Sequence, residues 1–501
     1  MIRLRALAVA GVALIALVGC GSKVPLGSAT SESSGSIGLT VPTYPGPTAV
    51  GTVGGPTTGP TGSAAPGSAL PASPGRTGSG PLTTATATAT GSRSSPSGTP
   101  TTHRSTAPIE IGFLNTGISN AASFGVGTGQ TFAAQTVFQA LAKYYNAHGG
   151  LDGRKVVPVV AQTDTADSSW SADYQAACQT FTQDHHVSAV IGYSFAYIAT
   201  FEACLAKAGV PHLTGGYATG DAGSYRDYPD IVSTTGLTDD RRYLVQIKAG
   251  VQQGLLKPGD KVGILLDNCP EEMRAYNTTV VPYLKAQRLV GVLESEGCPQ
   301  GASDDASAIV QIQSAVLKFR SLGVNKLVLE GPPVLVFALE AQAQGWRPTY
   351  LLTSASGGAS LDGTIPAAQE ANIHGAGWMP EVDVSVAHQA PKTAPERKCL
   401  AMLKSERLVP RQYNDYLYAY TTCDGLSLYE TALEHDGDST TASQVVSAIT
   451  GLGRSWHGAS MIDGATDFTA TKRDAPAEYR PWGWSGSCRC FAYTGAARAL
   501  P

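Results

Sequence analysis

Apolar runs of strand length alternate, from residue 109 onwards, with segments whose apolar residues recur at helical spacing. The runs are rich in β-branched residues and end in turn-forming residues, which is typical of buried strands. In the intervening segment GQTFAAQTVFQALAKYYNAHG (129–149), Phe132, Val137, Leu141 and Tyr144 can share one helical face. The predicted strands are IEIGFLN (109–115), KVVPVVAQ (155–162), VSAVIGYS (187–194), PHLTGG (211–216), KVGILLD (261–267), LVGVLESE (289–296), NKLVLEG (325–331), TYLLTSA (349–355) and SCRCFAYT (487–494).

This order of elements predicts an α/β fold with parallel sheets. Because the strand–helix alternation occurs twice in similar order, the chain is expected to form two similar Rossmann-like lobes. A long helical block follows, including RQYNDYLYAYTTCDGLSLYETALEHDG (411–437), whose tyrosines and leucines repeat at helical spacing and are predicted to be core.

The stretch YYNAHGGLDGRKVVPVV (144–160) shows how one such unit is joined. Gly149 and Gly150 can take the left-handed conformation that ends a helix, because they lack a Cβ atom. Asp152 and Gly153 are turn-forming residues. A helix therefore passes into a buried strand within a few residues, as in half of a βαβ unit.

The N-terminus predicts export. Arg3 and Arg5 precede a short apolar run, ALAVAGVALIALVG (6–19), which ends at Cys20. Residues 1–20 are similar to a bacterial lipoprotein signal, in which that cysteine is lipidated and becomes the mature N-terminus; the alternative is a plain signal peptide. Residues 21–107 are dominated by Gly, Ser, Thr, Pro and Ala and are predicted to be a disordered tether.

The remainder, 108–501, is acidic. Six of the 35 basic and one of the 39 acidic residues lie before it, which leaves a net charge of −9. Such a domain lacks the basic surface that nucleic acid requires, so we expect no nucleic-acid partner.

Eight of the nine cysteines follow Cys20, an even number that suggests disulfides in an exported protein. Eight cysteines allow 105 connectivities. Cys269 and Cys298 each follow a predicted strand, and consecutive parallel strands are often neighbours. The spacings fit no zinc pattern, and no metal is expected. Nearest-neighbour pairing predicts Cys178–Cys204, Cys269–Cys298, Cys399–Cys423 and, as a very small ring, Cys488–Cys490.

Two glycine-containing loops are similar to motifs that bind a cofactor or carry a nucleophile. GVGTGQ (125–130) is close to the dinucleotide fingerprint, but Gln130 replaces the third glycine. GYSFA (192–196) is close to a nucleophile elbow, which leaves an extracellular serine hydrolase using Ser194 as an alternative. Both loops follow predicted strands, where open α/β sheets bind ligands.

Several phrases together resemble one family. IEIGFLN, the helix end NAHGGLDGR (146–154), AVIGYSFAYIA (189–199) and KAGVPHL (207–213) look like the type I periplasmic binding proteins of the branched-chain amino acid-binding group. The resemblance implies two lobes joined by three hinge crossings, expected near 235–240, 353–358 and 456–466. It assigns 108–235 and 357–455 to an N-terminal lobe, and 236–356 and 456–501 to a C-terminal lobe.

The resemblance also implies an extracytoplasmic, lipid-anchored solute-binding protein of an ABC importer, without enzymatic activity or cofactor. Its expected partners are a small solute, a membrane permease and the membrane itself, reached through the lipid. A ligand sensor or scaffold of the same fold is the alternative. The aromatic residues among the implied site suggest a large, flat or partly aromatic ligand. The implied ligand-binding residues are Tyr193, Ser194, Phe195, Tyr197, Gly216, Tyr217, Thr219, Asn268, Glu271 and Glu330.

Overall fold

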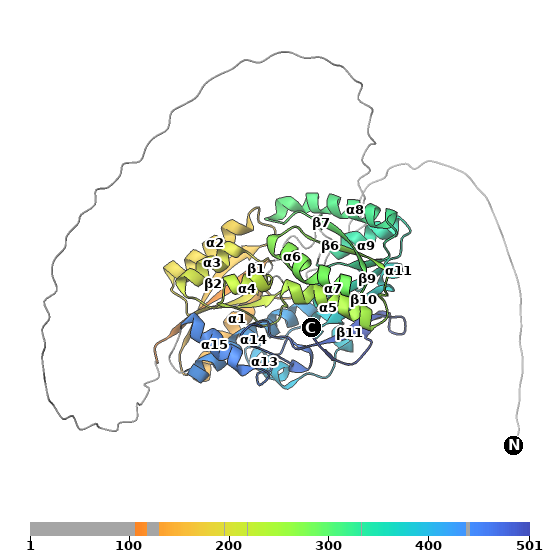
Figure 1. Cartoon of the computed structure of the whole chain (residues 1–501). Coiled ribbons are helices and arrows are strands. Elements are labelled where there is room, and N and C mark those ends of the chain that lie inside the picture. The colour runs from red at the N-terminus through yellow and green to blue at the C-terminus, as the bar shows by residue number, and fades with distance from the viewer. Residues whose placement is uncertain (1–105, 118–129, 195, 218, 332, 437–440) are drawn as a thin grey trace, which may run out of the picture. The chain divides into compact units, whose positions relative to one another are not determined.

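A computed structural model describes residues 106–117, 130–194, 196–217, 219–331, 333–436 and 441–501. The predicted signal, Cys20, the tether, most of the GVGTGQ loop and Phe195 lie outside these residues. Figure 1 shows that the described part is α/β throughout, with two sheets covered by helices. None of its helices is long and apolar enough to cross a membrane.

The first sheet has five parallel strands in the order β2-β1-β3-β4-β5. Helices α2 and α3 cover one of its faces, and α1, α13 and α14 cover the other (Figure 1). The strands are β1 (Ile109–Gly117), β2 (Val156–Asp164), β3 (Ala189–Ser194), β4 (His212–Gly216) and β5 (Ile231–Ser233). The helices are α1 (Ala134–Ala147), α2 (Trp170–Gln179), α3 (Ala199–Ala208), α4 (Ala222–Asp227), α13 (Ala394–Ser405), α14 (Tyr413–Asp436) and α15 (Ala442–Leu452). We call this sheet and these helices the first lobe.

The second sheet has eight strands: seven run in the order β12-β11-β10-β9-β8-β6-β7, and β13 pairs with β11. The strands are β6 (Lys261–Asp267), β7 (Val290–Glu296), β8 (Lys326–Val328), β9 (Thr349–Thr353), β10 (Ile373–Gly377), β11 (Glu478–Ser485), β12 (Cys490–Tyr493) and β13 (Arg498–Ala499). The helices are α5 (Asp239–Gln252), α6 (Pro270–Ala275), α7 (Val281–Ala286), α8 (Asp305–Ser321), α9 (Pro333–Ala343), α10 (Gly358–Leu361) and α11 (Ala367–Glu370). This sheet and these helices form the second lobe.

The predicted α/β class with two sheets is confirmed, and two details are corrected. The second sheet is mixed, because β11 runs antiparallel to both β10 and β12. Strand β10 pairs with β9 and β11, so residues 373–377 belong to the second sheet rather than to the N-terminal lobe. The predicted hinge crossing near 353–358 is therefore wrong: the chain leaves the second sheet after Gly377, through α12 (Pro380–Asp383).

The connection between helix and strand at 144–160 has the predicted form. Helix α1 ends at Ala147, and Gly149 and Gly150 have φ values of 106° and 90°. A Cβ atom on Gly150 would overlap the backbone of Arg154. Only a residue without a side chain fits there, so the turn into β2 depends on it.

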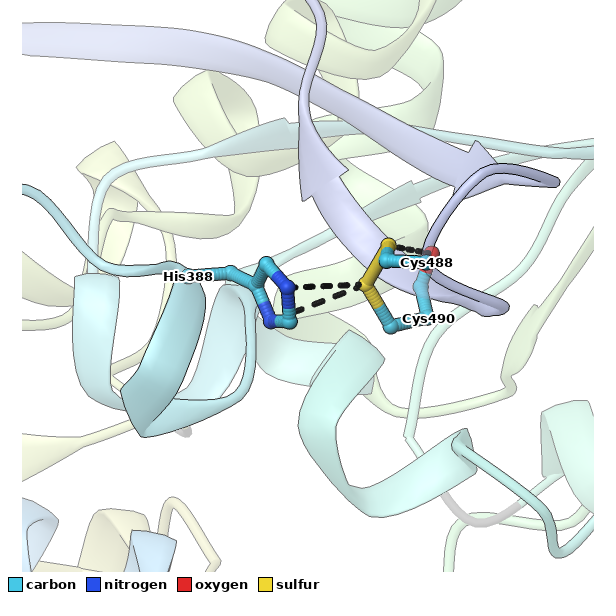
Figure 2. Close-up of side chains that lie close together, drawn as sticks. All are labelled: His388, Cys488 and Cys490. Carbon is cyan, nitrogen blue, oxygen red and sulfur yellow. Dashed lines mark hydrogen bonds between the residues drawn. A yellow bond between two sulfur atoms is a disulfide. The ribbon is translucent and has the colours of Figure 1, made fainter.

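All four predicted disulfides are present. Three of them join successive helices or the ends of successive strands, with Cα–Cα distances of 6.4 Å for Cys178–Cys204, 4.7 Å for Cys269–Cys298 and 5.9 Å for Cys399–Cys423. Cys488–Cys490 closes the small ring, and His388 lies beside it, 3.5 Å from Cys490 Sγ (Figure 2). The two sulfur atoms are bonded to each other, so they are not free thiolate ligands.

Candidate functional site

A cavity of about 670 Å³ lies where the carboxyl ends of strands from both lobes face each other. The first lobe contributes residues after β2, β3 and β4 and from the start of α14. The second lobe contributes residues after β6, β7, β8 and β9 and from α5. Loops at the carboxyl ends of parallel strands are where open α/β sheets bind ligands. We call this cavity the cleft.

The two lobes touch each other beside the cleft. The backbone N–H of Trp170 donates to the carbonyl of Gln300 at 2.9 Å, and that of Ala302 donates to Asp167 at 2.9 Å. Elsewhere Arg274, on α6, makes two hydrogen bonds to the carboxylate of Asp221, at 2.8 and 2.9 Å. The structure is therefore in a closed arrangement.

One wall of the cleft is aromatic. Tyr193, at the end of β3, makes edge-to-face contacts with Tyr217 and Tyr418, with ring centroids 5.7 and 5.6 Å apart. Burial raises the pKa of all three phenols, so they remain neutral. Trp170 and Tyr197 also line the cleft. This wall offers ring faces and edges to an apolar body.

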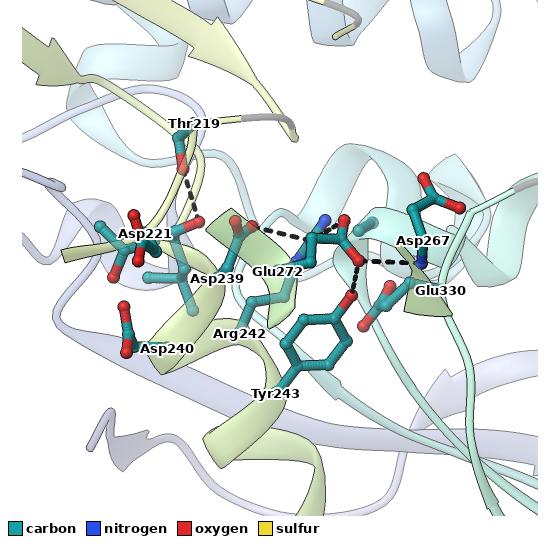
Figure 3. A network of polar contacts seen from close by, with 12 residues as sticks. Thr219, Asp221, Asp239, Asp240, Arg242, Tyr243, Asp267, Glu272 and Glu330 are labelled. Atoms are coloured by element: carbon teal, nitrogen blue, oxygen red, sulfur yellow. Dashed lines mark hydrogen bonds and ion pairs between the residues drawn. The ribbon is translucent and has the colours of Figure 1, made fainter. Parts of the chain in front are cut away.

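The opposite wall is polar and built around Arg242 on α5. Its guanidinium donates to Asp239 at 2.8 Å and to Glu272 at 3.2 Å. The hydroxyl of Tyr243 donates to the other oxygen of Glu272 at 2.6 Å, and the backbone N–H of Asp267 donates to the same oxygen at 3.1 Å. Figure 3 shows this network, which fixes Glu272 from three sides.

Glu330 follows β8 and is also held in place. Its carboxylate accepts hydrogen bonds from Thr353 at 2.7 Å, from Ser356 at 3.0 Å and from Gln246. Burial raises the pKa of Glu330 to about 7, against the opposing charge of Arg242 and the two hydroxyl donors. Such a group is partly ionised near neutral pH and responds to any charge that enters the cleft.

Asp267 and Glu296 end neighbouring strands and lie opposite each other in the β6–β7 register. Their carboxyl groups are hydrogen-bonded to each other. Burial, and then the charge of Glu272, raises the pKa of Glu296 to about 8 and that of Asp267 well above its usual value. Two adjacent carboxylates repel each other, so the pair keeps a proton near neutral pH unless a cation replaces it.

The structure brings together half of the residues predicted for the site. Those that line the cleft are Tyr193, Tyr197, Tyr217, Glu271 and Glu330. Those that do not line it are Ser194, Gly216, Thr219 and Asn268, whereas Phe195 lies outside the described residues.

Two of the four that miss the cleft, Ser194 and Thr219, do so for local reasons. Successive strand residues point to opposite faces, so Tyr193 reaches the cleft and Ser194 does not. The hydroxyl of Thr219 donates to the carbonyl of Leu237 at 2.7 Å. The side chain of Ser194 is 3% exposed, which leaves it poorly placed as the nucleophile of the hydrolase alternative.

Sequence reasoning missed the polar wall. Four polar residues share one face of α5, because three of them follow the first by three, four and seven positions. They are Asp239, Arg242, Tyr243 and Gln246. Charged residues at such spacing usually lie in solvent, whereas these four are at most 7% exposed. A polar helical face directly after a hinge crossing was the available signal.

Known proteins share this architecture. A family model described as "Periplasmic binding protein" matches residues 108–482. An ABC-transporter solute-binding protein from R. palustris, solved with 4-hydroxybenzoate, has 17% identity and a TM-score of 0.56 over 79% of this chain and 98% of its own. A branched-chain amino acid ABC-transporter protein from Thermus thermophilus, solved with valine, has 15% identity and a TM-score of 0.56 over 78% and 97%.

A fatty acid ABC-transporter substrate-binding protein from Thermomonospora curvata has 16% identity and a TM-score of 0.54 over 78% of this chain and 92% of its own. At these identities the likeness concerns the fold. The search of curated proteins found no match.

Proposed function

The chain belongs to the type I periplasmic binding proteins of the branched-chain amino acid-binding family, and from that premise we propose that it captures a small solute in the cleft and delivers it to an ABC permease. It is a solute-binding protein of the ABC-transporter type. The proposed solute is amino-acid-like, or an amide or aromatic compound. The protein binds and releases the solute unchanged.

The observation that carries this proposal is the closed cleft. Its 670 Å³ is within the range of small-molecule sites and is lined from both lobes. A solute that contacts both lobes binds the closed arrangement more tightly than an open one, and so shifts the equilibrium towards closure. A permease that recognises the closed shape then receives only loaded protein.

The aromatic wall supports the solute class. Tyr193, Tyr217 and Tyr418 present ring edges and faces at one side of the cleft, suited to a flat or aromatic body. Solved relatives that carry 4-hydroxybenzoate or valine support a solute of this size.

We further propose that the chain is lipid-anchored at the extracytoplasmic face of the membrane. Cys20 would carry the lipid, and residues 21–107 would tether the folded part. Mass spectrometry of the mature N-terminus should find a lipidated Cys20. Cys20→Ala should move the protein from the membrane fraction to the soluble fraction, whereas an unchanged membrane fraction would contradict the anchor.

Thermal denaturation of the full Cys20→Ala chain tests solute binding. The panel holds amino acids, amides, aromatic acids, amines and sugars. A true solute at a hundred times its Kd stabilises the folded state by about 2.7 kcal/mol. If no solute class raises the melting temperature, the binding proposal fails, and the sensor or scaffold alternative, with an unrelated partner, takes its place.

Transport requires a second measurement. Deleting the gene for this chain should abolish cellular uptake of the solute that stabilises it. Unchanged uptake would contradict the importer role and favour a sensor that binds the same solute.

A further inference from the structure

The ionisable acidic and basic side chains that line the cleft are almost all acidic. Eight acidic side chains line it, against one basic side chain, Arg242, and no lysine or histidine among the described lining residues. The acidic residues are Asp239, Asp267, Glu271, Glu272, Glu296, Asp304, Asp305 and Glu330.

Arg242 does not balance this charge. It is 7% exposed, and its guanidinium donates to Asp239 and Glu272. One cation therefore forms ion pairs with two carboxylates, and acidic side chains outnumber basic ones in the lining. A field of this kind attracts cations into the cleft and repels anions from it.

Glu296 is a buried carboxyl group whose side-chain partner is itself acidic. It lines the cleft, yet is only 4% exposed. Among the described residues, its carboxylate has one hydrogen-bond partner, the carboxyl group of Asp267. A buried carboxylate is costly unless it meets a donor or a positive charge.

Resting on the function proposed above, we propose that the cleft takes a cationic solute, an amine or a guanidine. Its positive head group would lie between Asp267 and Glu296. Its body would lie against the aromatic wall of Tyr193, Tyr217 and Tyr418. An N–H-rich cation supplies the donors that these two carboxyl groups lack and cancels their mutual repulsion.

An organic cation fits this site better than a metal ion. Among the described residues, one group of three potential ligands has its ligand atoms within 4.8 Å of one another: His388, Cys488 and Cys490, away from the cleft. The cleft carboxylates therefore do not converge on a single point, as the several oxygen ligands of Ca²⁺ must. An ammonium or guanidinium group carries several N–H donors and can bond to two neighbouring carboxyl groups at once.

Calorimetry with matched solutes tests this proposal on the full Cys20→Ala chain. The cations are tyramine, agmatine and putrescine. The controls are 3-(4-hydroxyphenyl)propionate, which replaces the amine of tyramine with an acid, the zwitterion tyrosine, and CaCl₂. We expect at least one of the three cations to bind, and tyramine to bind at least about tenfold more tightly than the propionate, because an acid would be left unpaired among carboxylates.

The outcomes separate this inference from the proposed function. Binding of the acid or of tyrosine without any amine would overturn the cationic class and leave solute binding intact. Binding of calcium alone would also overturn it. Absence of binding by every solute here and in the broader panel would overturn both.

Glu296→Gln provides the residue-level test. It keeps the shape of the side chain and removes its charge, so cation affinity should fall by about tenfold or more. Glu294→Gln is the matched control: Glu294 lies on the same strand, pairs with Lys318 at 2.5 Å and does not line the cleft. Equal affinities for the two variants would place the cation elsewhere and refute the assignment.

Discussion

Gly301 lies in the loop between β7 and α8, where the second lobe meets the first. A Cβ atom there would overlap the carbonyl oxygen of Ser168, on the opposite lobe. The backbone of Gly301 is extended, with φ 170° and ψ 173°, so alanine fits the loop itself. Gly301→Ala should therefore leave each lobe intact and oppose only their contact.

The size of the effect follows from the contacts beside Gly301. The N–H of Trp170 bonds to Gln300, and the N–H of Ala302 bonds to Asp167, both at 2.9 Å. Each backbone hydrogen bond stabilises by about 0.5–1.5 kcal/mol. Losing both disfavours closure by about 1–3 kcal/mol, which is roughly a 5–150-fold smaller ratio of closed to open protein.

Single-molecule fluorescence transfer between dyes on α3 and α8 measures that ratio directly. Wild type and Gly301→Ala are compared without solute and with the solute that most raises the melting temperature. Gly297→Ala is the control, because its new Cβ atom would have no neighbour within 4 Å. If Gly301→Ala and Gly297→Ala show the same distance distribution as wild type, the closing role of these contacts is refuted.

Three further predictions follow from single features. The folded-state pKa of Glu296 is raised from 4.5 to about 8, so the folded state binds more protons than the unfolded one in this window. The free energy of unfolding without solute should therefore fall as the pH rises from 4.5 to 8, by on the order of 3–5 kcal/mol. Urea denaturation at several pH values should show this fall, and Glu296→Gln should flatten the dependence of the unfolding free energy on pH. Arg274→Gln breaks the ion pair with Asp221 between the lobes. Because the Arg274 side chain is 46% exposed, the closed arrangement should lose about 1 kcal/mol of stability, which calorimetry should detect as a roughly fivefold loss of solute affinity. An unchanged affinity would exclude a role for this ion pair in closure. Gly375→Ala places a Cβ atom inside the ring of fully buried Trp482, and should lower the free energy of unfolding by about 3 kcal/mol or more in urea; a wild-type midpoint would contradict this packing.

The sequence determined much of the fold because the relevant signals are local. Buried strands and amphipathic helices follow from periodicity within each segment, and Gly149 and Gly150 mark a turn through their own backbone freedom. The disulfides were also predictable, since three of them join successive helices or the ends of successive strands, and such elements often lie side by side.

The site was predictable only where it depends on strand ends. Tyr193, Tyr217 and Glu330 line the cleft because they end or follow strands whose positions the sequence shows. Ser194 follows Tyr193 directly and still misses the cleft, because alternation along β3 turns it away. Being next to a site in sequence does not place a side chain within it.

Tertiary structure alone decided the pairing and the electrostatics. Strand β10 contains two glycines in five residues, a weak strand signal, and it is held by its neighbours β9 and β11. Arg242 is a typical solvent-exposed residue until α5 packs it into the cleft. Asp267 and Glu296 are separated by 28 intervening residues, and only the β6–β7 register brings them together. Such contacts depend on distances between elements remote in the chain, which no local pattern encodes.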